Sequence, residues 1–373
     1  MKKTVFLISL AALTVLLAIG GCERKVVVEE NDLVDNASCF TCHGDDNLAI
    51  VQAGGQWERS RHASGENIDK NRNYESFYSS CERCHTSEGF VAYVTEVPYE
   101  GDQFSAIGCF TCHAPHTNGN LSLRVMDAIT LEDGSAFDRG TANLCVTCHH
   151  SRRNVNTYVS DDVTLDEHWG PHGSVQGDML IGANAYEYDS YTYSNSAHTN
   201  VATDGCNNCH MTGSIGYYVG GHTWNMEYVR LEDTDETIYD NLAGCNASTC
   251  HNGDMASLDP TADADFDNDG SVETIANEIY WLLDSLKVLV VEAGFYDDIN
   301  GHPIEDVEIT DSDSAGAFYN FEFVMADNSH GIHNTDYTVD LLQSSIGYLA
   351  TGDPNGFGAL DGNKLDKMFA SAH

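Results

Sequence analysis

The chain has 373 residues, a formal net charge of −41 and a sequence pI of about 4.4. Such an acidic protein repels nucleic acid and anionic lipid surfaces, which excludes both as electrostatic partners. The charge favours cationic partners instead, such as a basic redox protein or metal ions.

The N-terminus has the pattern of a lipoprotein signal peptide. Two lysines precede an apolar stretch, residues 5–19, which has the length of a signal sequence and is short for a membrane span. Two glycines then lead to Cys22, as in a lipobox whose cysteine is lipidated after cleavage. We expect residues 1–21 to be removed, Cys22 to carry lipid and residues 22–36 to form a linker. Ordinary cleavage that leaves Cys22 free is the alternative.

Five Cys-x-x-Cys-His motifs and one stretched motif account for every other cysteine of the 13. At this spacing two thiols add to the vinyl groups of haem, and the following histidine ligates the iron. A redox dithiol or a zinc site fits one copy, but repeated copies with a histidine after each pair favour six c-type haems. The motifs are Cys39/Cys42/His43, Cys81/Cys84/His85, Cys109/Cys112/His113, Cys145/Cys148/His149, Cys206/Cys209/His210 and, with four intervening residues, Cys245/Cys250/His251.

Each haem iron has a second axial position, so the histidines outside the motifs also matter. A second histidine closes the iron and suits electron transfer, whereas an open position permits chemistry. The sequence has 17 histidines, more than the motifs use. We select distal ligands by neighbouring Gly, Pro or aromatic residues, which permit close approach of haem: His62, His116, His172, His198, His222 and His333. For any one of them, a hydrogen-bonded or surface imidazole is the alternative.

The spacing between motifs is too irregular for a solenoid repeat. The intervening segments are rich in Gly, Asn, Asp, Ser and Tyr, which predicts loops with short helices local to each motif. Only residues 89–97 alternate as a strand would. With so little chain for each haem, we expect the polypeptide to wrap haems without building a large core of its own.

The last hundred residues have a different pattern, with apolar side chains at helical spacing. They predict helices over residues 272–291, 315–326 and 335–349. We therefore expect a mainly α fold with extensive loops: a loop-rich region with four haems over residues 37–160, then a two-haem region with long helices over residues 161–373.

An acidic loop precedes the first of these helices. Asp265, Asp267 and Asp269, followed by Gly270, resemble the start of a calcium-binding loop, so they are candidate calcium ligands. Loop position 12, where an EF-hand has Glu, is Ala276. A polar loop that caps the helix is the alternative.

The C-terminal half, about residues 170–350, resembles the pentahaem ammonia-forming nitrite reductases and their multihaem relatives. The matching elements, in order, are Ser196-Ala197-His198, the segment from Gly205 to Met211, His222, the stretched motif, and Ser329-His330-Gly331-Ile332-His333. The resemblance implies distal ligation by His198, His222 and His333, close haem pairs and a helical C-terminal lobe. Those reductases bind nitrite at a haem whose motif ends in Lys, whereas every motif here ends in His, which argues against that activity.

We therefore expect a six-haem electron-transfer lipoprotein on the periplasmic or cell-surface face of the outer membrane. Its partners would be other redox proteins or an extracellular acceptor. One alternative is a reductase of a small nitrogen or sulfur oxyanion at one open haem. Another is a subunit of an extracellular filament, in which the terminal His373 would ligate a haem of the next subunit.

Overall fold

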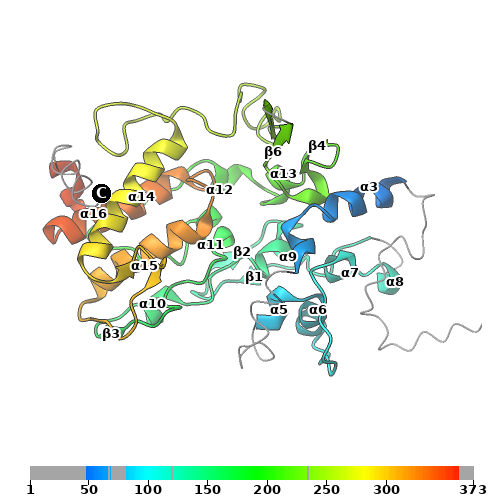
Figure 1. The fold of residues 1–373 in the computed structure, drawn as a ribbon, viewed down its shortest axis with the longest axis horizontal. Coiled ribbons are helices and arrows are strands. Elements are labelled where there is room, and N and C mark those ends of the chain that lie inside the picture. The colour runs from blue at the N-terminus through cyan, green and yellow to red at the C-terminus, as the bar shows by residue number, and fades with distance from the viewer. Residues whose placement is uncertain (1–47, 66–67, 69–80, 119–120, 233–234, 361–373) are drawn as a thin grey trace, which may run out of the picture. The chain divides into compact units, whose positions relative to one another are not determined.

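The computed structural model describes residues 48–65, 68, 81–118, 121–232 and 235–360 (Figure 1). Contacts divide the chain between Ala37 and Ser38, and all described residues belong to the second unit. Over these ranges the fold is mainly helical with long loops and short strands, which confirms the predicted fold class. The domain boundary at residue 160 stays a prediction. Five predicted functional residues lie outside the described residues: Cys22, Cys39, Cys42, His43 and His373.

Short helices stand at four of the described motifs, as the sequence predicted: α5 (Glu82–His85), α7 (Cys109–Cys112), α9 (Ala142–Val146) and α13 (Asn207–His210). The stretched motif forms turns instead. Other short helices lie between the motifs: α3 (Leu48–Trp57), η3 (Arg61–Ser64), α8 (Pro115–Asn118), α10 (Val155–Tyr158), α11 (Gln176–Ile181), α12 (His198–Val201) and η5 (Gly221–Thr223).

The described strands form antiparallel pairs, so each sheet has two strands and none is extended further. The pairs are β1 (Ile129–Thr130) with β2 (Ala136–Phe137), β3 (Val163–Thr164) with β10 (Glu308–Ile309), β4 (Ser214–Ile215) with β5 (Val219–Gly220), β6 (Glu227–Glu232) with β7 (Asp235–Asp240), and β8 (Tyr296–Asp297) with β9 (His302–Pro303).

The strand-like alternation over residues 89–97 was misleading, because this segment belongs to helix α6 (Ser87–Thr95). Thr86 caps the helix: its side chain accepts a hydrogen bond from the Gly89 amide at 2.9 Å. The buried carboxylate of Glu88 accepts hydrogen bonds from the backbone and hydroxyl of Ser105, at 2.7 and 2.6 Å. The helix cap and the hydrogen bonds of Glu88 stabilise the helix more than the weak strand-like alternation of apolar residues favours a strand.

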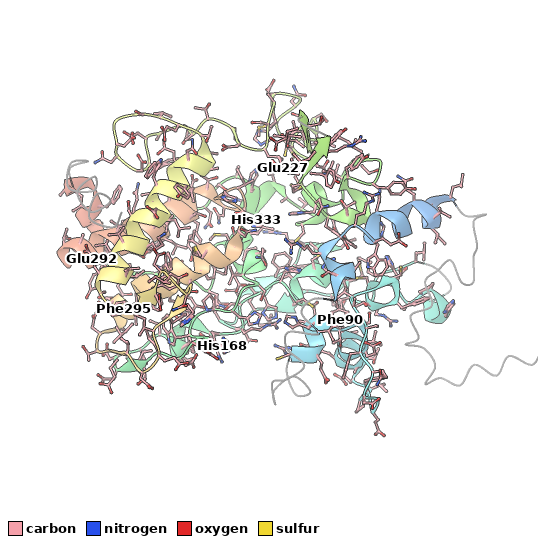
Figure 2. The ribbon with its side chains drawn as sticks, viewed as in Figure 1. Phe90, His168, Glu227, Glu292, Phe295 and His333 are labelled. Carbon is pink, nitrogen blue, oxygen red and sulfur yellow. The ribbon has the colours of Figure 1, made fainter. Side chains whose placement is uncertain are left out.

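The three predicted C-terminal helices are present as α14 (Ile275–Glu292), α15 (Ser312–Asp327) and α16 (Thr335–Thr351), and η6 (Pro354–Ala359) follows them. Figure 2 labels His333 in the loop between α15 and α16. Helix α14 begins later than predicted because Thr274 still forms a β-bridge with Thr261. Over the described residues, no helix has both the length and the apolar character needed to cross a membrane.

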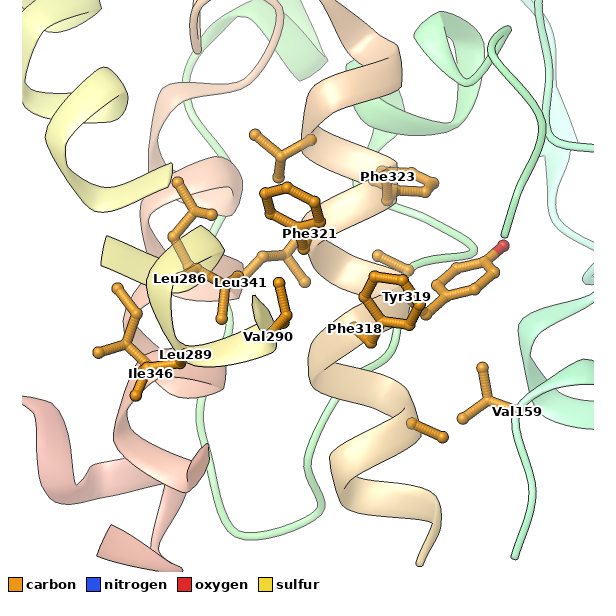
Figure 3. Packing of buried hydrophobic residues seen from close by; sticks show 14 of the residues in the cluster. Val159, Leu286, Leu289, Val290, Phe318, Tyr319, Phe321, Phe323, Leu341 and Ile346 are labelled. Atoms are coloured by element: carbon orange, nitrogen blue, oxygen red, sulfur yellow. The ribbon is translucent and has the colours of Figure 1, made fainter. Parts of the chain in front are cut away.

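The long helices bury a continuous apolar core (Figure 3). This differs from the expectation that the polypeptide would not build a large core of its own. Phe318, Tyr319 and Phe321 of α15 are fully buried, and the indole of Trp169 stacks on Phe318 with ring centres 5.2 Å apart. The motif-bearing part has a much smaller cluster around Phe137. The expectation was wrong because it averaged the chain over the haems, whereas the apolar residues concentrate in the helical lobe.

Replacing Phe321 by Ala should destabilise this lobe strongly. The side chain is fully buried and lies edge-on to Tyr296 at 5.1 Å between ring centres. Loss of a buried Phe costs about 3–5 kcal/mol of unfolding free energy. Chemical denaturation followed by circular dichroism measures it, with Met325→Ala, a 45% exposed residue of the same helix, as control. Equal stability of the two variants would contradict a tightly packed core.

Candidate functional site

The histidine of each described motif faces a second histidine ring. The pairs, with the distances between ring centres, are His85–His172 at 6.2 Å, His113–His222 at 6.3 Å, His149–His62 at 6.2 Å, His210–His333 at 6.3 Å and His251–His198 at 6.2 Å. These partners lie far from the motifs in sequence. Five independent pairs of distant segments therefore place two histidine rings at the same separation.

The common separation is the one that two imidazoles on a single metal ion would adopt. A metal–imidazole bond is about 2 Å long and Nε2 lies about 1.2 Å from the ring centre, so two such rings have centres roughly 6.4 Å apart. All five partners are among the six histidines that the sequence singled out. The sixth, His116, lies against the ring of Phe110 at 5.4 Å. The motif histidine that has no described pair, His43, is outside the described residues.

Hydrogen bonds at Nδ1 orient several of these rings. His113 and His210 donate from Nδ1 to the carbonyls of Leu121 and Trp224, at 2.7 and 2.8 Å. His198 does the same to a carbonyl of the α15–α16 loop at 2.7 Å. A donor at Nδ1 leaves the lone pair on Nε2, which is the atom available to a metal.

Burial keeps most of the paired rings neutral, which is the form that binds a metal. Burial, assisted by the neighbouring His149, lowers the pKa of His62 to about 4. Burial, assisted by the charge of Arg152, does the same for His172. It also lowers the pKa of His222. These imidazoles can therefore offer a lone pair throughout the physiological pH range.

The stretched motif closes in the same way as the regular ones. In three of the regular motifs the histidine amide donates to the carbonyl of the first cysteine, as from His149 to Cys145 at 2.9 Å. The amide of His251 bonds the carbonyl of Cys245 at the same 2.9 Å despite two extra residues. The side chain of Asn246 braces the longer loop through two 2.9 Å hydrogen bonds with the backbone of Met255. The extra residues are thus absorbed without displacing the histidine.

Two glycines position His222 against helix α3. The side chain of Gln56 accepts a hydrogen bond from the His222 amide at 3.0 Å. Gly221 has φ +55°, and a Cβ there would lie 2.4 Å from the Gln56 oxygen. A Cβ on Gly220 would collide with the Gly213 carbonyl. Only glycine allows this close approach.

Cysteines of neighbouring motifs lie near one another. Cys84 and Cys148 shift each other's thiol pKa, and Cys145 raises the pKa of Cys206. Cys209 interacts electrostatically with both cysteines of the stretched motif. The second, fourth, fifth and sixth motifs therefore follow one another in space as a continuous series.

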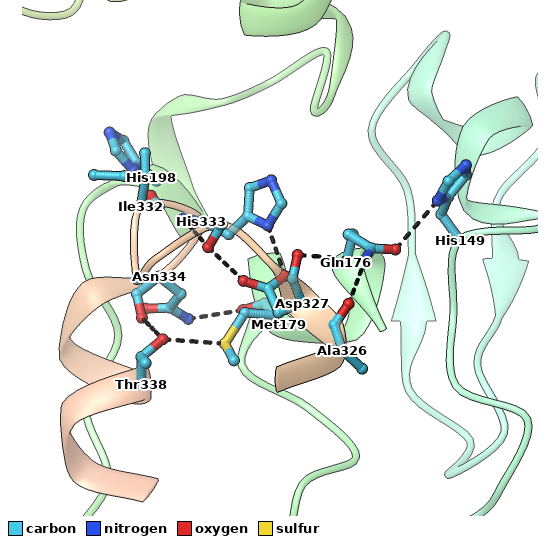
Figure 4. A network of polar contacts seen from close by, with 12 residues as sticks. His149, Gln176, Met179, His198, Ala326, Asp327, Ile332, His333, Asn334 and Thr338 are labelled. Atoms are coloured by element: carbon cyan, nitrogen blue, oxygen red, sulfur yellow. Dashed lines mark hydrogen bonds and ion pairs between the residues drawn. The ribbon is translucent and has the colours of Figure 1, made fainter. Parts of the chain in front are cut away.

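A hydrogen-bonded network joins two of the histidine pairs (Figure 4). The Gln176 amide oxygen accepts from Nδ1 of His149 at 3.1 Å, and its nitrogen donates to the Ala326 and Asp327 carbonyls at 2.8 and 3.3 Å. The carboxylate of Asp327 accepts from Nδ1 of His333 at 2.7 Å. Sequence reasoning missed Gln176 and Asp327, because nothing in their local pattern distinguishes them from other polar residues near helix ends.

Three cationic or polar atoms near the second and fourth motifs fit the acidic groups of haem. Arg83 Nε, His150 Nδ1 and Arg152 Nη1 are buried and, within the described part of the chain, have no hydrogen-bond partner. Buried polar atoms normally have partners. A haem carries two propionates, and guanidinium groups are strong donors to carboxylates. The paired rings, the attachment cysteines and these atoms therefore fit c-type haem.

The three candidate calcium ligands lie together. One carboxylate oxygen from each of Asp265, Asp267 and Asp269 falls within 4.8 Å of the others. Burial raises the pKa of Asp267 to about 7, and the nearby carboxylates of Asp269 and Glu278 add to this rise. Glu278 accepts hydrogen bonds from the amides of Phe266, Asp267 and Glu273, so it clasps the loop. Calcium binding there stays a prediction.

Comparison with known proteins gave one similar solved structure. No family model matches the chain, and no curated protein does. The crystal structure of the outer cell wall cytochrome OcwA is similar at 17% sequence identity and a TM-score of 0.44. The similarity covers 79% of this chain but 49% of that one, so this chain spans about half the length of OcwA.

Proposed function

We propose that the chain is a six-haem c-type cytochrome that transfers electrons. It would be exported and anchored to the outer membrane by lipid on Cys22, and would pass electrons to redox proteins or to an extracellular acceptor. Haem supplies the one-electron chemistry when bound. The polypeptide would hold each haem, fix both axial imidazoles and exclude water.

The single observation that carries the proposal is the constant 6.2–6.3 Å separation of the five histidine pairs. Each pair contains one motif histidine, so its partner supplies a second axial ligand and leaves no face open for a substrate. By elimination, His116 becomes the proposed partner of His43.

The proximity of cysteines from different motifs supports transfer between sites. The cysteines of a c-type motif bind the edge of the porphyrin, so neighbouring cysteines bring two porphyrin edges close together. Cys84 near Cys148, and Cys145 near Cys206, would thus place three haems edge to edge. Close edges favour electron transfer without a mobile carrier.

Two alternatives make different demands. A reductase of a nitrogen or sulfur oxyanion needs one iron without a distal histidine, which the five described pairs oppose. A filament needs ligands from a second copy, whereas these pairs draw both histidines from one chain. No observation on the described residues favours either alternative.

The test is to purify the holoprotein, count its haems and record electron paramagnetic resonance (EPR) spectra of the oxidised form. We expect six haems per chain, all low-spin, because two imidazoles give a strong ligand field. A high-spin signal that corresponds to one haem would contradict the electron carrier and favour the reductase. Complete absence of covalent haem would overturn the proposal.

A further inference from the structure

The hydrogen-bond partners of the paired histidines differ in charge. Most of those present at Nδ1 are neutral, such as the Gln176 amide on His149 and the Trp224 carbonyl on His210. His333 is the exception among the described pairs, because its Nδ1 donates to the carboxylate of Asp327 at 2.7 Å. We call His210–His333, together with Asp327, the anionic pair.

Asp327 is placed to act on this ring as a fixed negative charge. Its side chain is 2% exposed. One oxygen accepts from His333, and the other accepts from the hydroxyl of Ser329. The amide of His333 in turn donates to the Ser329 hydroxyl at 3.2 Å. A buried carboxylate on a ligand ring increases the electron density that the ring gives to its metal.

Positive charge lies near the His85–His172 rings, which we call the cationic pair together with Arg83 and Arg152. The Arg152 amide donates to the Pro171 carbonyl at 2.9 Å, directly before His172, and Arg83 lies on α5 two residues before His85. Arg83 and Arg152 each retain a buried N–H without a partner among the described residues. These N–H groups could pair with haem propionates.

A central pair, His62–His149, lies between these two. On one side, Nη2 of Arg152 donates to the carbonyl of its motif residue Cys148 at 3.3 Å. Gln176 also connects His149 to the backbone of Asp327 (Figure 4). The three pairs therefore form a short path with opposite charges at its two ends.

We infer that Asp327 gives the anionic pair the lowest reduction potential of the five described sites and that Arg83 and Arg152 give the cationic pair the highest. The inference rests on the proposed function, since it requires an iron at each pair. Electrons would then move from the anionic pair through the central pair to the cationic pair.

The sign follows from charge alone. A negative charge stabilises the ferric state and lowers the potential, whereas a positive charge stabilises the ferrous state and raises it. In each transfer one iron loses the electron that the next one gains, and no bond forms or breaks. The path needs an external one-electron donor at one end and an acceptor at the other.

Asp327→Asn tests the anionic end. The amide keeps the shape and a hydrogen bond to His333 but removes the charge. Reductive titration of the holoprotein, followed by absorbance and EPR, should show the lowest-potential haem shifting upwards. At a fixed potential its ferrous-to-ferric ratio should rise about tenfold, which is about 59 mV for a one-electron couple. The control is Asp298→Asn, an exposed carboxylate that pairs with Lys287 at 3.3 Å.

Arg152→Gln tests the cationic end and should shift the highest-potential haem downwards. Arg230→Gln on β6 is the matched control, with a guanidinium 5.9 Å from the Tyr218 ring centre. Full haem content with unmoved potentials, or a shift of a middle haem in either variant, would overturn the inference. A protein without low-spin haem would instead refute the proposed function, so the two failures are distinguishable.

Discussion

Replacing His172 by Gly should convert one low-spin haem to high-spin and leave the others unchanged. His172 faces His85 at 6.2 Å between ring centres, and its loop holds it at φ +74°. Glycine adopts this conformation without strain, so the variant removes the ligand without straining the backbone. Ferric EPR and the high-spin charge-transfer absorbance measure the change.

Added imidazole distinguishes ligand loss from misfolding. A free imidazole that reaches the vacated position should restore the low-spin spectrum. His168→Gly serves as the control, because this 65% exposed side chain lies next to Glu167 at 3.1 Å. A low-spin spectrum in His172→Gly without imidazole would show that His172 is not a ligand.

The attachment residues and the helices were accessible to sequence reasoning because each has a local signature. A Cys-x-x-Cys-His motif is complete within five residues, and the period of α14 is visible in its own apolar side chains. The distal histidines have weaker signatures. Gly220 and Gly221 beside His222 reveal a close backbone approach, but not which ring is opposite.

The pairing and the charges could not be predicted, because both depend on how distant segments meet. His62 reaches His149 only because η3 packs near the fourth motif, and Asp327 reaches His333 only because α15 ends where the loop turns back. The core around Phe318 was missed for a related reason, since the average amount of chain for each haem says nothing about where apolar residues gather.

Replacing both Cys245 and Cys250 by Ser should remove one covalent haem. The stretched motif keeps the 2.9 Å closing bond of regular motifs, and His251 faces His198 at 6.2 Å. Thioether bonds survive acid denaturation, whereas a haem held only by two histidines is released. Intact mass after acid treatment should therefore fall by one haem relative to the unaltered protein.

The same double substitution at Cys81 and Cys84 calibrates the measurement, because this motif has the regular spacing. It should cost one haem and leave the stretched motif loaded. If only the variant at Cys81 and Cys84 loses a haem, Cys245 and Cys250 do not form thioethers. Any haem at the His198–His251 pair would then be held without a covalent bond. If both lose one, two extra residues between the thiols are compatible with attachment, because the Cys245 carbonyl still fixes the His251 backbone.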